Sequence, residues 1–266
     1  MRYEIAFIGV GKMGGAVCAG ACRAFGAEKV AAFVRDPARR PAIEEEYGCA
    51  AVGSAAEAVR EAGIVVLCMK PHQIKAAAEE LAPVLAARET PATLVSIAAG
   101  VTLEKLRAYT SPAQPLVRVM PNLPALIGRG MMLWTAEGLS DAAEAAVVRW
   151  LSACGEVRRI DEKLMDAGSA TAACSPAFAA MFIEALADGG VLAGLSRADA
   201  TALAAAALEG TAAMVLAGSE PAKIKDDVCS PGGSTIEGVL KLEQAGMRAA
   251  VTDALIASWR RSSELG

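Results

Sequence analysis

The sequence predicts a doubly wound α/β domain over residues 1–160, followed by an all-α domain over residues 161–266. In the first part, short apolar runs alternate with stretches of helical length and pattern. A glycine-rich turn joins the first apolar run to the first helical stretch. After about Asp161 the strand-like runs disappear, and long segments rich in Ala, Leu and Met replace them. A chain of 266 residues has enough apolar material for two cores.

Several segments of the first part are near-continuous apolar runs, as expected for strands that helices cover on both faces. These runs are residues 3–10, 30–34, 63–69, 92–99 and 115–120. The segments between them include Gly14–Phe25 and Ser54–Glu61, which have helical length and spacing. Strands that alternate with helices in this way indicate a parallel sheet.

The second part carries signals for where its helices begin and end. Ser196 with Asp199 three residues later is typical of a helix start, and Gly218 follows the expected end of that helix. Pro221 then suits the first turn of the next helix. Pro176 lies inside an apolar helical pattern, where a proline removes a backbone donor, so we expect a kink or break there.

These helices are apolar on too many faces for an isolated bundle of about 105 residues. Because a helix that is apolar all round must be buried, intertwined homodimerisation is the simplest interpretation. No stretch reaches the roughly 18 consecutive apolar residues expected of a membrane span. The richest runs, Ala170–Ile183 and Ala202–Leu208, contain or adjoin polar residues. We therefore expect buried helices and no membrane association.

The net charge and the cysteine pattern argue against several classes of function. A formal net charge of −4 without a basic run argues against a nucleic-acid partner. The N-terminal segment is charged at Glu4 and runs directly into glycines, unlike a signal peptide. The seven cysteines show no C-x-x-C spacing, so we expect free or buried thiols, a reducing cytoplasmic location and no metal site.

The segment "FIGVGKMGG" places a G-x-G-x-x-G pattern directly after a predicted strand and at the start of a helix. In that context the pattern predicts a Rossmann-like dinucleotide site. Gly9 makes the tight turn, Gly11 lets a pyrophosphate approach the backbone, and Gly14 lets helix and strand pack closely. Lys12 and Met13, inside the loop, are assigned to the same cofactor site. The alternative is a tight turn that binds no ligand.

The end of the second predicted strand bears on the choice of cofactor. NAD enzymes typically have an acidic residue there, whereas NADP enzymes use a basic one. The sequence "FVRDPARR" offers Arg35 first, then Asp36, with Arg39 and Arg40 close behind. We favour NADP(H) with Arg35 at the 2′-phosphate and keep NAD(H) as the alternative. Arg39 and Arg40 fit an ordinary solvated helix start equally well.

Two further segments place a proline at the carboxyl end of a strand, where open α/β sheets bind ligands. In "CMKPHQ", Lys70 and Pro71 are assigned to the cofactor site. In "VMPN", Asn122 is assigned to the cofactor, the substrate or both. The lone His72 is interpreted as a loop residue rather than as an acid–base group.

Several longer motifs run along the chain from end to end. They are "FIGVGKMG", "MKPHQ", "LVSIAAGVTLEKL", "VRVMPNLPALIGRG", "SPAF..MFIEALADGGV", "VCSPGGSTIEGV" and "GMRAAV.DA". Together these motifs resemble the pyrroline-5-carboxylate reductase family. This family reduces a cyclic imine acid to proline with NAD(P)H. Its subunits pair through a C-terminal helical domain, and many members assemble further, often into decamers.

The resemblance implies that the turn in "VCSPGGSTIEGV" holds the substrate. Thr235 matches the family threonine that hydrogen-bonds the ring nitrogen, and it is the predicted catalytic residue. A Gly-Gly turn that enters a helix also suits a small carboxylate, because its N–H groups are free. The alternative is a loop that only closes one helix and caps the next. The predicted substrate-binding residues are Ser230, Gly232, Gly233, Ser234, Thr235 and Asn122.

The chain departs from the family pattern at a few positions. Many relatives carry Ser-Gly-Ser where this chain has Ala172, Ala173 and Cys174, and Phe178 replaces a tyrosine. We expect that segment to line the pocket near the dimer interface, so substrate preference could differ. Lys12 replaces a residue that is often asparagine or histidine, and the Ser-for-Thr change in "PGGST" is mild.

Other interpretations stay open at this point. A β-hydroxyacid dehydrogenase shares the layout but uses a lysine in the stretch "DAGSATAACSPAFAAMF", which has none. A non-catalytic NADP-binding paralogue or redox sensor, or a reductase of a related cyclic imine acid, also fits the pattern. The sequence leaves open the choice between NADPH and NADH, the oligomer size beyond a dimer, and feedback inhibition by proline.

Overall fold

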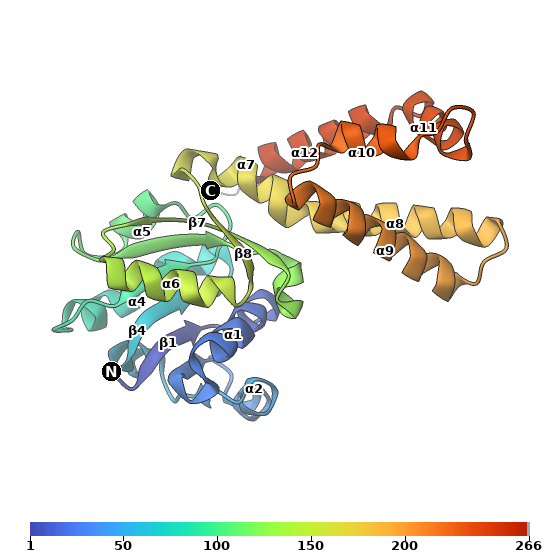
Figure 1. Ribbon diagram of the computed structural model, residues 1–266. Coiled ribbons are helices and arrows are strands. Elements are labelled where there is room, and N and C mark those ends of the chain that lie inside the picture. Colours follow the sequence, from blue (N-terminus) through green and yellow to red (C-terminus); the bar gives the residue numbers. More distant parts are fainter. Residues whose placement is uncertain (265–266) are drawn as a thin grey trace. The chain divides into compact units, whose positions relative to one another are not determined.

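The computed structural model describes residues 1–264 (Figure 1). The chain separates into two compact units, one of Met1–Cys174 with the residues from Ser258 onward, the other of Ser175–Ala257. Within the described residues every strand belongs to the first unit, and the last one ends at Arg159. The predicted division into functional domains, 1–160 and 161–266, stays a prediction. Residues 265 and 266 of the second predicted domain lie outside the described part.

The first unit is built on one twisted sheet with strand order β3-β2-β1-β4-β5-β6-β7-β8. Strands β1 to β6 run parallel, β7 pairs antiparallel with β6, and β8 runs parallel to β7. The predicted doubly wound α/β fold is confirmed. The strands are β1 Tyr3–Ile8, β2 Val30–Phe33, β3 Ala50–Ala51, β4 Ala62–Leu67, β5 Thr93–Ser96, β6 Leu116–Met120, β7 Gly130–Glu137 and β8 Gly155–Arg159.

All five predicted strands are present and shorter than their apolar runs; β5 has only four residues of the run 92–99, and β4 begins one residue before the run 63–69. Strands β3, β7 and β8 were not predicted. The short β3 has only two residues, and β8 reads "GEVRR" because an edge strand is charged rather than apolar. The β7 segment contains "MMLW", which is apolar but low in the β-branched residues that mark a strand.

Helices cover both faces of this sheet, as Figure 1 shows. Side chains alternate along β1, so Phe7 faces one apolar core and Ala6 faces the other. The Phe7 side contains α1 Lys12–Phe25, α2 Arg40–Tyr47 and α6 Asp141–Ser152. The Ala6 side contains α3 Ala55–Glu61, α4 Pro71–Ala86 and α5 Leu103–Ala108.

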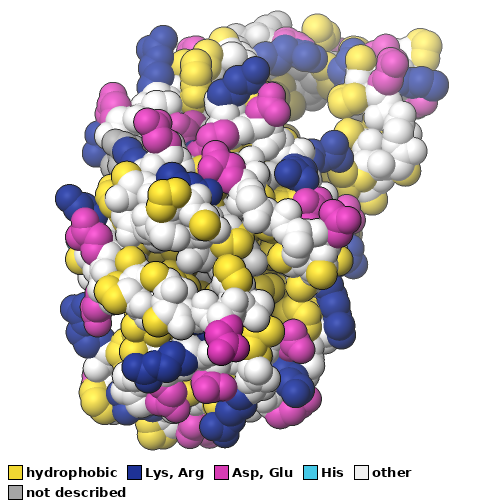
Figure 2. All heavy atoms as spheres, turned by 90° about the vertical axis from the view of Figure 1, so that its left-hand side faces the viewer, with side chains coloured by type: hydrophobic (Ala, Val, Ile, Leu, Met, Phe, Trp, Pro, Cys, Tyr) yellow, Lys and Arg dark blue, Asp and Glu magenta, His cyan; other side chains and the backbone are white. Residues whose placement is uncertain are grey.

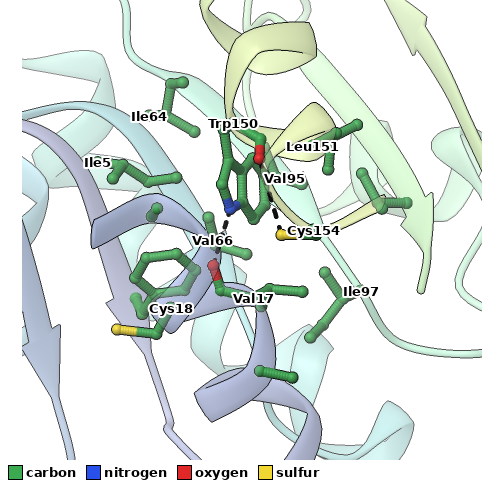
Figure 3. Packing of buried hydrophobic residues seen from close by; sticks show 14 of the residues in the cluster. Ile5, Val17, Cys18, Ile64, Val66, Val95, Ile97, Trp150, Leu151 and Cys154 are labelled. Carbon is green, nitrogen blue, oxygen red and sulfur yellow. Dashed lines mark hydrogen bonds between the residues drawn. The ribbon is translucent and has the colours of Figure 1, made fainter. Parts of the chain in front are cut away.

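Trp150 is the largest fully buried side chain of the first core (Figure 3). Its indole Nε1 donates to the carbonyl of Val17 on α1 at 2.9 Å, which satisfies the buried N–H. Its ring meets Phe7 of β1 edge-on, with centroids 5.7 Å apart. Trp150 thereby ties α6 to both α1 and the central strand.

The helix is not broken at Pro176, and the irregularity predicted there takes the form of a π-helical turn, Ala170–Cys174, directly before α8 Ser175–Leu192. Pro176 has no N–H to donate to the carbonyl four residues earlier, that of Ala172. Asn122 Nδ2 donates to this carbonyl instead, at 2.9 Å. The side chain of a strand-end residue therefore satisfies a carbonyl that the proline deprives of its helical donor.

The second unit is helical and begins at α8. The predicted start of α9 at Ser196 is confirmed, because its Oγ accepts from Asp199 N at 3.1 Å. Gly218 follows α9 with a φ of +104°, and Pro221 is the first residue of α10, both as predicted. The helices are α8 Ser175–Leu192, α9 Arg197–Leu216, α10 Pro221–Val228, α11 Ser234–Gln244 and α12 Met247–Glu264, the last of which also enters the first unit.

The long apolar helices are not buried within a single chain. Glu162–Leu192 and Arg197–Leu216 contain windows of mean hydropathy 1.5 and 1.3, and only 11% of each window is buried. By length and composition both could cross a membrane, which corrects the expectation that no stretch is apolar enough. Buried helices of soluble proteins have the same length and composition. If these two helices are core elements, another molecule must cover them, because this chain leaves them mostly exposed.

A buried arginine on β6 links the sheet to the first helical turns that follow β8. Arg118 on β6 is 4% exposed, and its guanidinium contacts Glu162 Oε1 at 3.0 Å and Asp166 Oδ1 at 2.7 Å. Glu162 Oε1 also accepts from Leu103 N at 3.1 Å. The segment of Glu162–Leu164 and α7 Met165–Ser169 is thus held against β6 and the start of α5.

We predict that Arg118→Ala lowers the free energy of unfolding by about 3 kcal/mol, because two partly buried carboxylates lose their partner. Urea unfolding of the full chain, followed by circular dichroism, measures this change. Lys75→Ala is the control, since its 3.9 Å pair with Glu79 is exposed and should contribute less than about 0.5 kcal/mol. Equal effects of the two variants would contradict the prediction.

Candidate functional site

The loop between β1 and α1 has the geometry that its glycines predict. Gly9 adopts a φ of +84°, which a residue with a side chain rarely takes. A Cβ on Gly14 would lie 2.9 Å from the Gly9 carbonyl oxygen and 3.0 Å from Cys68 Cβ. A Cβ on Gly11 would meet nothing within 4 Å. The loop is therefore closely packed at Gly9 and Gly14 and open to a ligand at Gly11.

The N-terminus of α1 is suited to an anion. No side chain caps it, and its first turn contains no acidic residue. Lys12 is exposed at the first helical position, and Met13 is half-buried beside it. Free N–H groups and the helix dipole favour a phosphate at such an end. The assignment of these residues to a cofactor stays a prediction that the geometry fits.

The segment after β4 adjoins the glycine loop. A Cβ on Gly9 would lie 3.6 Å from Met69 N, so the carboxyl ends of β1 and β4 are neighbours. Lys70 is exposed there, its N–H donates to Gln73 Oε1 at 3.2 Å, and Pro71 begins α4. Because β1 pairs with β2 on one side and β4 on the other, this crevice is the topological switch point where such sheets bind ligands.

The arginines after β2 differ in their contacts. Asp36 accepts from Ala38 N at 3.0 Å and so caps the short helix that follows. Arg39 Nη2 donates to the carbonyl of Val10, in the glycine loop, at 2.8 Å. Arg35 is exposed and makes no hydrogen bond or ion pair with the described residues. Arg40 Nη2 donates to Gly53 at 3.1 Å.

Asn122 lies at the carboxyl end of β6, as predicted, but both ends of its amide are engaged. Besides the bond to Ala172, its Oδ1 accepts from Met131 N at 2.9 Å. The residue is 7% exposed. The structure therefore gives Asn122 a positioning role, and its assignments to substrate and cofactor stay predictions.

A segment that was predicted as a strand end and a family motif, but not as part of the site, also reaches this edge of the sheet. Residues Ile97–Gly100 follow β5, which lies between β4 and β6. Ser96 Oγ accepts from Ala98 N at 3.2 Å, and Gly100 adopts a φ of +72°. The signal in the sequence was a glycine shortly after an apolar run, the same signal that marks the first loop.

In the second unit, residues Ser230–Gly233 form the turn that leads into α11. Gly233 N donates to Ser230 O at 3.0 Å across Pro231 and Gly232. Gly232 has a φ of +72°, as a type II turn requires after proline. A Cβ on Gly233 would lie 2.4 Å from Ser230 Oγ, a side-chain atom that can rotate away, so only Gly232 is required as glycine by its backbone conformation.

The N-terminus of α11 has no side-chain cap. Its first N–H groups, those of Ser234 and Thr235, belong to exposed residues, and Ser230 is exposed beside them. An uncapped helix start with nearby hydroxyls has the chemistry of a carboxylate site. The predicted substrate residues after α10 thus lie within one turn of the second unit, whereas the glycine loop belongs to the first.

The thiol that packs against the glycine loop, that of Cys68, is not activated as a nucleophile. Burial raises the pKa of the Cys68 thiol, so that thiol stays protonated at neutral pH. His72, which was expected in a loop, lies in the first turn of α4 and is exposed on a groove of about 410 Å³ between α4 and α5. The face in Figure 2 carries basic and acidic side chains interspersed, without a continuous basic patch.

A cluster of cysteines elsewhere in the first unit contains the most strongly shifted thiols. Hydrogen bonds from Cys18 and then Cys49 lower the pKa of Cys22. Hydrogen bonds to Cys22 and Cys49, with burial, raise the pKa of Cys18. This cluster is distinct from the predicted cofactor and substrate loops.

Comparisons with known proteins agree over the whole chain. A sequence family described as "Pyrroline-5-carboxylate reductase dimerisation" matches residues 162–265, and one described as "NADP oxidoreductase coenzyme F420-dependent" matches residues 4–100. The pyrroline-5-carboxylate reductase of Pisum sativum is 36% identical over 267 residues, 99% of this chain and 96% of its own length. That of Escherichia coli (strain K12) is 37% identical over 270 residues, 100% of this chain and 99% of its own length.

A solved structure shows the same fold. The pyrroline carboxylate reductase of Plasmodium falciparum, determined with NADP bound, superposes with a TM-score of 0.88. It is 28% identical in sequence, and the match covers 100% of this chain and 98% of that one.

We predict that Gly14→Ala and Gly11→Ala have different effects on stability. The added Cβ at Gly14 meets a backbone oxygen at 2.9 Å, so we expect a loss of about 2 kcal/mol. At Gly11 there is open space, and the free energy of unfolding should change by less than about 0.5 kcal/mol. Thermal unfolding without cofactor measures both. If Gly11→Ala were the more destabilising variant, the described packing of the loop would be wrong.

Proposed function

The chain belongs to the pyrroline-5-carboxylate reductase family, and we propose from this membership that it reduces 1-pyrroline-5-carboxylate to L-proline, the last step of proline biosynthesis. NAD(P)H, when bound, supplies the hydride that adds to the C=N carbon. The observation that carries the proposal is the bare turn before α11, whose uncapped N–H groups suit a small carboxylate.

The substrate turn binds through its backbone in this proposal. The N–H groups of Ser234 and Thr235 donate to the carboxylate, and Ser230 adds a hydroxyl. Gly232 and Gly233 keep the backbone free of side chains, so that the ring can approach it closely. Backbone N–H groups carry no formal charge, so the turn can bind the carboxylate without an arginine side chain.

Thr235 holds the ring nitrogen. The imine must carry a proton to be electrophilic, and the saturated ring nitrogen of the product keeps that proton. A substrate that binds already protonated needs no strong acid from the protein. Thr235 therefore orients the ring, and most of the rate comes from holding its C=N carbon in the reactive position.

The glycine loop is the proposed site for the cofactor pyrophosphate, with Gly11 at the open position and Lys12 and Met13 beside it. We favour NADP(H) over NAD(H). Asp36 is engaged as a helix cap, so the exposed Arg35 is the residue free to meet a 2′-phosphate. Lys70, Pro71 and Asn122 border the same edge of the sheet. The NADP in the Plasmodium falciparum structure supports this choice.

The proposed assembly is a homodimer through the C-terminal helices, with a decamer as the larger form. The family match over residues 162–265 and the exposed apolar side chains of α8 and α9 support pairing. A second copy would bury Leu192, Leu203 and Leu216, which are 91%, 59% and 75% exposed in one chain. Burial by a second copy also makes a membrane unnecessary for these helices.

The proposed location is the cytoplasm, without a nucleic-acid partner. All seven cysteines are free thiols, as expected in a reducing compartment. The net charge of −4 and the interspersed charges on the face in Figure 2 support the expectation of no nucleic-acid partner.

One assay separates the proposal from its alternatives. Purified protein, 1-pyrroline-5-carboxylate and NADPH or NADH should give cofactor oxidation with formation of proline. A non-catalytic paralogue or redox sensor would bind cofactor without turnover. A reductase of a related cyclic imine acid would turn over a ring homologue faster, which is plausible because Ala172, Ala173 and Cys174 replace the family's Ser-Gly-Ser.

We predict that Thr235→Ala lowers kcat/KM roughly 10²-fold, because the ring nitrogen loses its orienting partner. Steady-state kinetics with saturating NADPH measures the change. Thr201→Ala is the matched control, since that hydroxyl donates within its own helix to Arg197 O at 2.8 Å. Unchanged kinetics in Thr235→Ala would remove the residue from the mechanism.

We predict that Arg35→Ala lowers the preference for NADPH over NADH by about tenfold, since a charge-assisted hydrogen bond to a phosphate is worth about 1.5–3 kcal/mol. The ratio of the two kcat/KM values measures this preference. Arg39→Ala is the comparison, because Arg39 supports the glycine loop and should weaken both cofactors alike. If only Arg39→Ala changed the ratio, the 2′-phosphate would belong to Arg39.

A further inference from the structure

Three cysteines that are scattered in the sequence meet beside the first core. Cys18 and Cys22 lie one helical turn apart on α1, and Cys49 lies between α2 and β3. Their three sulfur atoms all lie within 4.8 Å of one another, and Cys18 Sγ is 3.9 Å from Cys49 Sγ. None of the three forms a disulfide. The Cys18 sulfur points away from the Trp150 ring (Figure 3).

This spacing matches that of thiolates around one metal ion. Three sulfurs at roughly 2.3 Å from a central ion in one plane lie about 4 Å apart. Small rotations about the Cα–Cβ bonds would therefore complete the coordination without moving the backbone. Cys18 and Cys49 are buried, whereas Cys22 is partly exposed and leaves a route for an ion.

We propose that Cys18, Cys22 and Cys49 bind one thiophilic closed-shell metal cation, Zn²⁺ or Cu⁺. Within the described residues the group includes no histidine or carboxylate, so the donors are sulfur alone. All-sulfur donors select soft or borderline cations and disfavour Mg²⁺ and Ca²⁺. The sequence analysis expected no metal site, because no pair of these cysteines has C-x-x-C spacing.

The net charge of the metal with its three thiolates favours Zn²⁺ over Cu⁺. Each thiol that becomes a ligand releases its proton to solvent. Three thiolates with Zn²⁺ leave one net negative charge, and with Cu⁺ they leave two, which costs more in a mostly buried place. Zn²⁺ prefers four ligands, and water could enter as the fourth on the side of the partly exposed Cys22.

The bound ion would connect two parts of the nucleotide-binding unit. Two ligands come from α1, and the third comes from the segment after α2. Since binding to the folded chain alone stabilises it, the ion should raise the Tm of the full-length protein. This readout does not depend on catalytic activity or on the proposed substrate.

The test uses the reduced full-length protein freed of metal and titrated with Zn²⁺ against a chromophoric chelator. We expect one ion per chain and a higher Tm, with at least about tenfold weaker binding in Cys18→Ala, Cys22→Ala and Cys49→Ala. Cys154→Ala is the matched control, since it is a buried thiol on the same core and outside the cluster. If all four variants bound Zn²⁺ as tightly as the unchanged protein, the proposal would be overturned.

A second measurement on the unchanged protein covers the case in which a variant fails to fold. Cd²⁺ serves as the spectroscopic probe, because thiolate-to-metal charge transfer gives an ultraviolet band whose size reports the number of sulfur ligands. A band for three thiolates per ion supports the site, and the absence of this band together with no stoichiometric binding of Cu⁺ overturns it. Titration with Cu⁺ under anaerobic conditions is the other arm. Stoichiometric binding of Cu⁺ without Zn²⁺ supports the sulfur site and assigns it to the monovalent ion.

Discussion

The contact between α1 and the two central strands determines where the predicted cofactor site can form. Gly14 packs so closely on the Gly9 carbonyl and on Cys68 that no side chain fits between them. This contact places the uncapped start of α1 at the crevice between β1 and β4, where Gly11 is open. The arginine after β2 and the segment after β4 are then brought to the same edge of the sheet.

Both predicted halves of the site rely on backbone N–H groups at the start of a helix. The α1 start suits a pyrophosphate, and the α11 start, behind Gly232 and Gly233, suits a carboxylate. At the α11 start the named side chains are uncharged, whereas Lys12, Arg35 and Lys70 add positive charge near the α1 start. The buried pair of Arg118 with Glu162 and Asp166 meanwhile secures the segment that leads from the sheet into the helices.

The central strands and the glycine loop could be predicted because their signals are local. An apolar run, a glycine that needs positive φ and a proline at a helix start each depend on only a few neighbouring residues. The edge strand β8 was missed because solvent, rather than a second helix layer, covers it and its residues are charged. The expectation that the long helices are buried was incomplete, since one chain by itself cannot bury them.

The sequence by itself determined the doubly wound α/β class of the first unit, the loop at Gly9–Gly14 and the bare turn before Thr235, because each depends on patterns within short segments. Only the tertiary structure decided what distant residues do together. It engages both ends of the Asn122 amide and gathers Cys18, Cys22 and Cys49 into one group of thiols. Such pairings depend on how helices pack against the sheet, and no spacing within one segment encodes them.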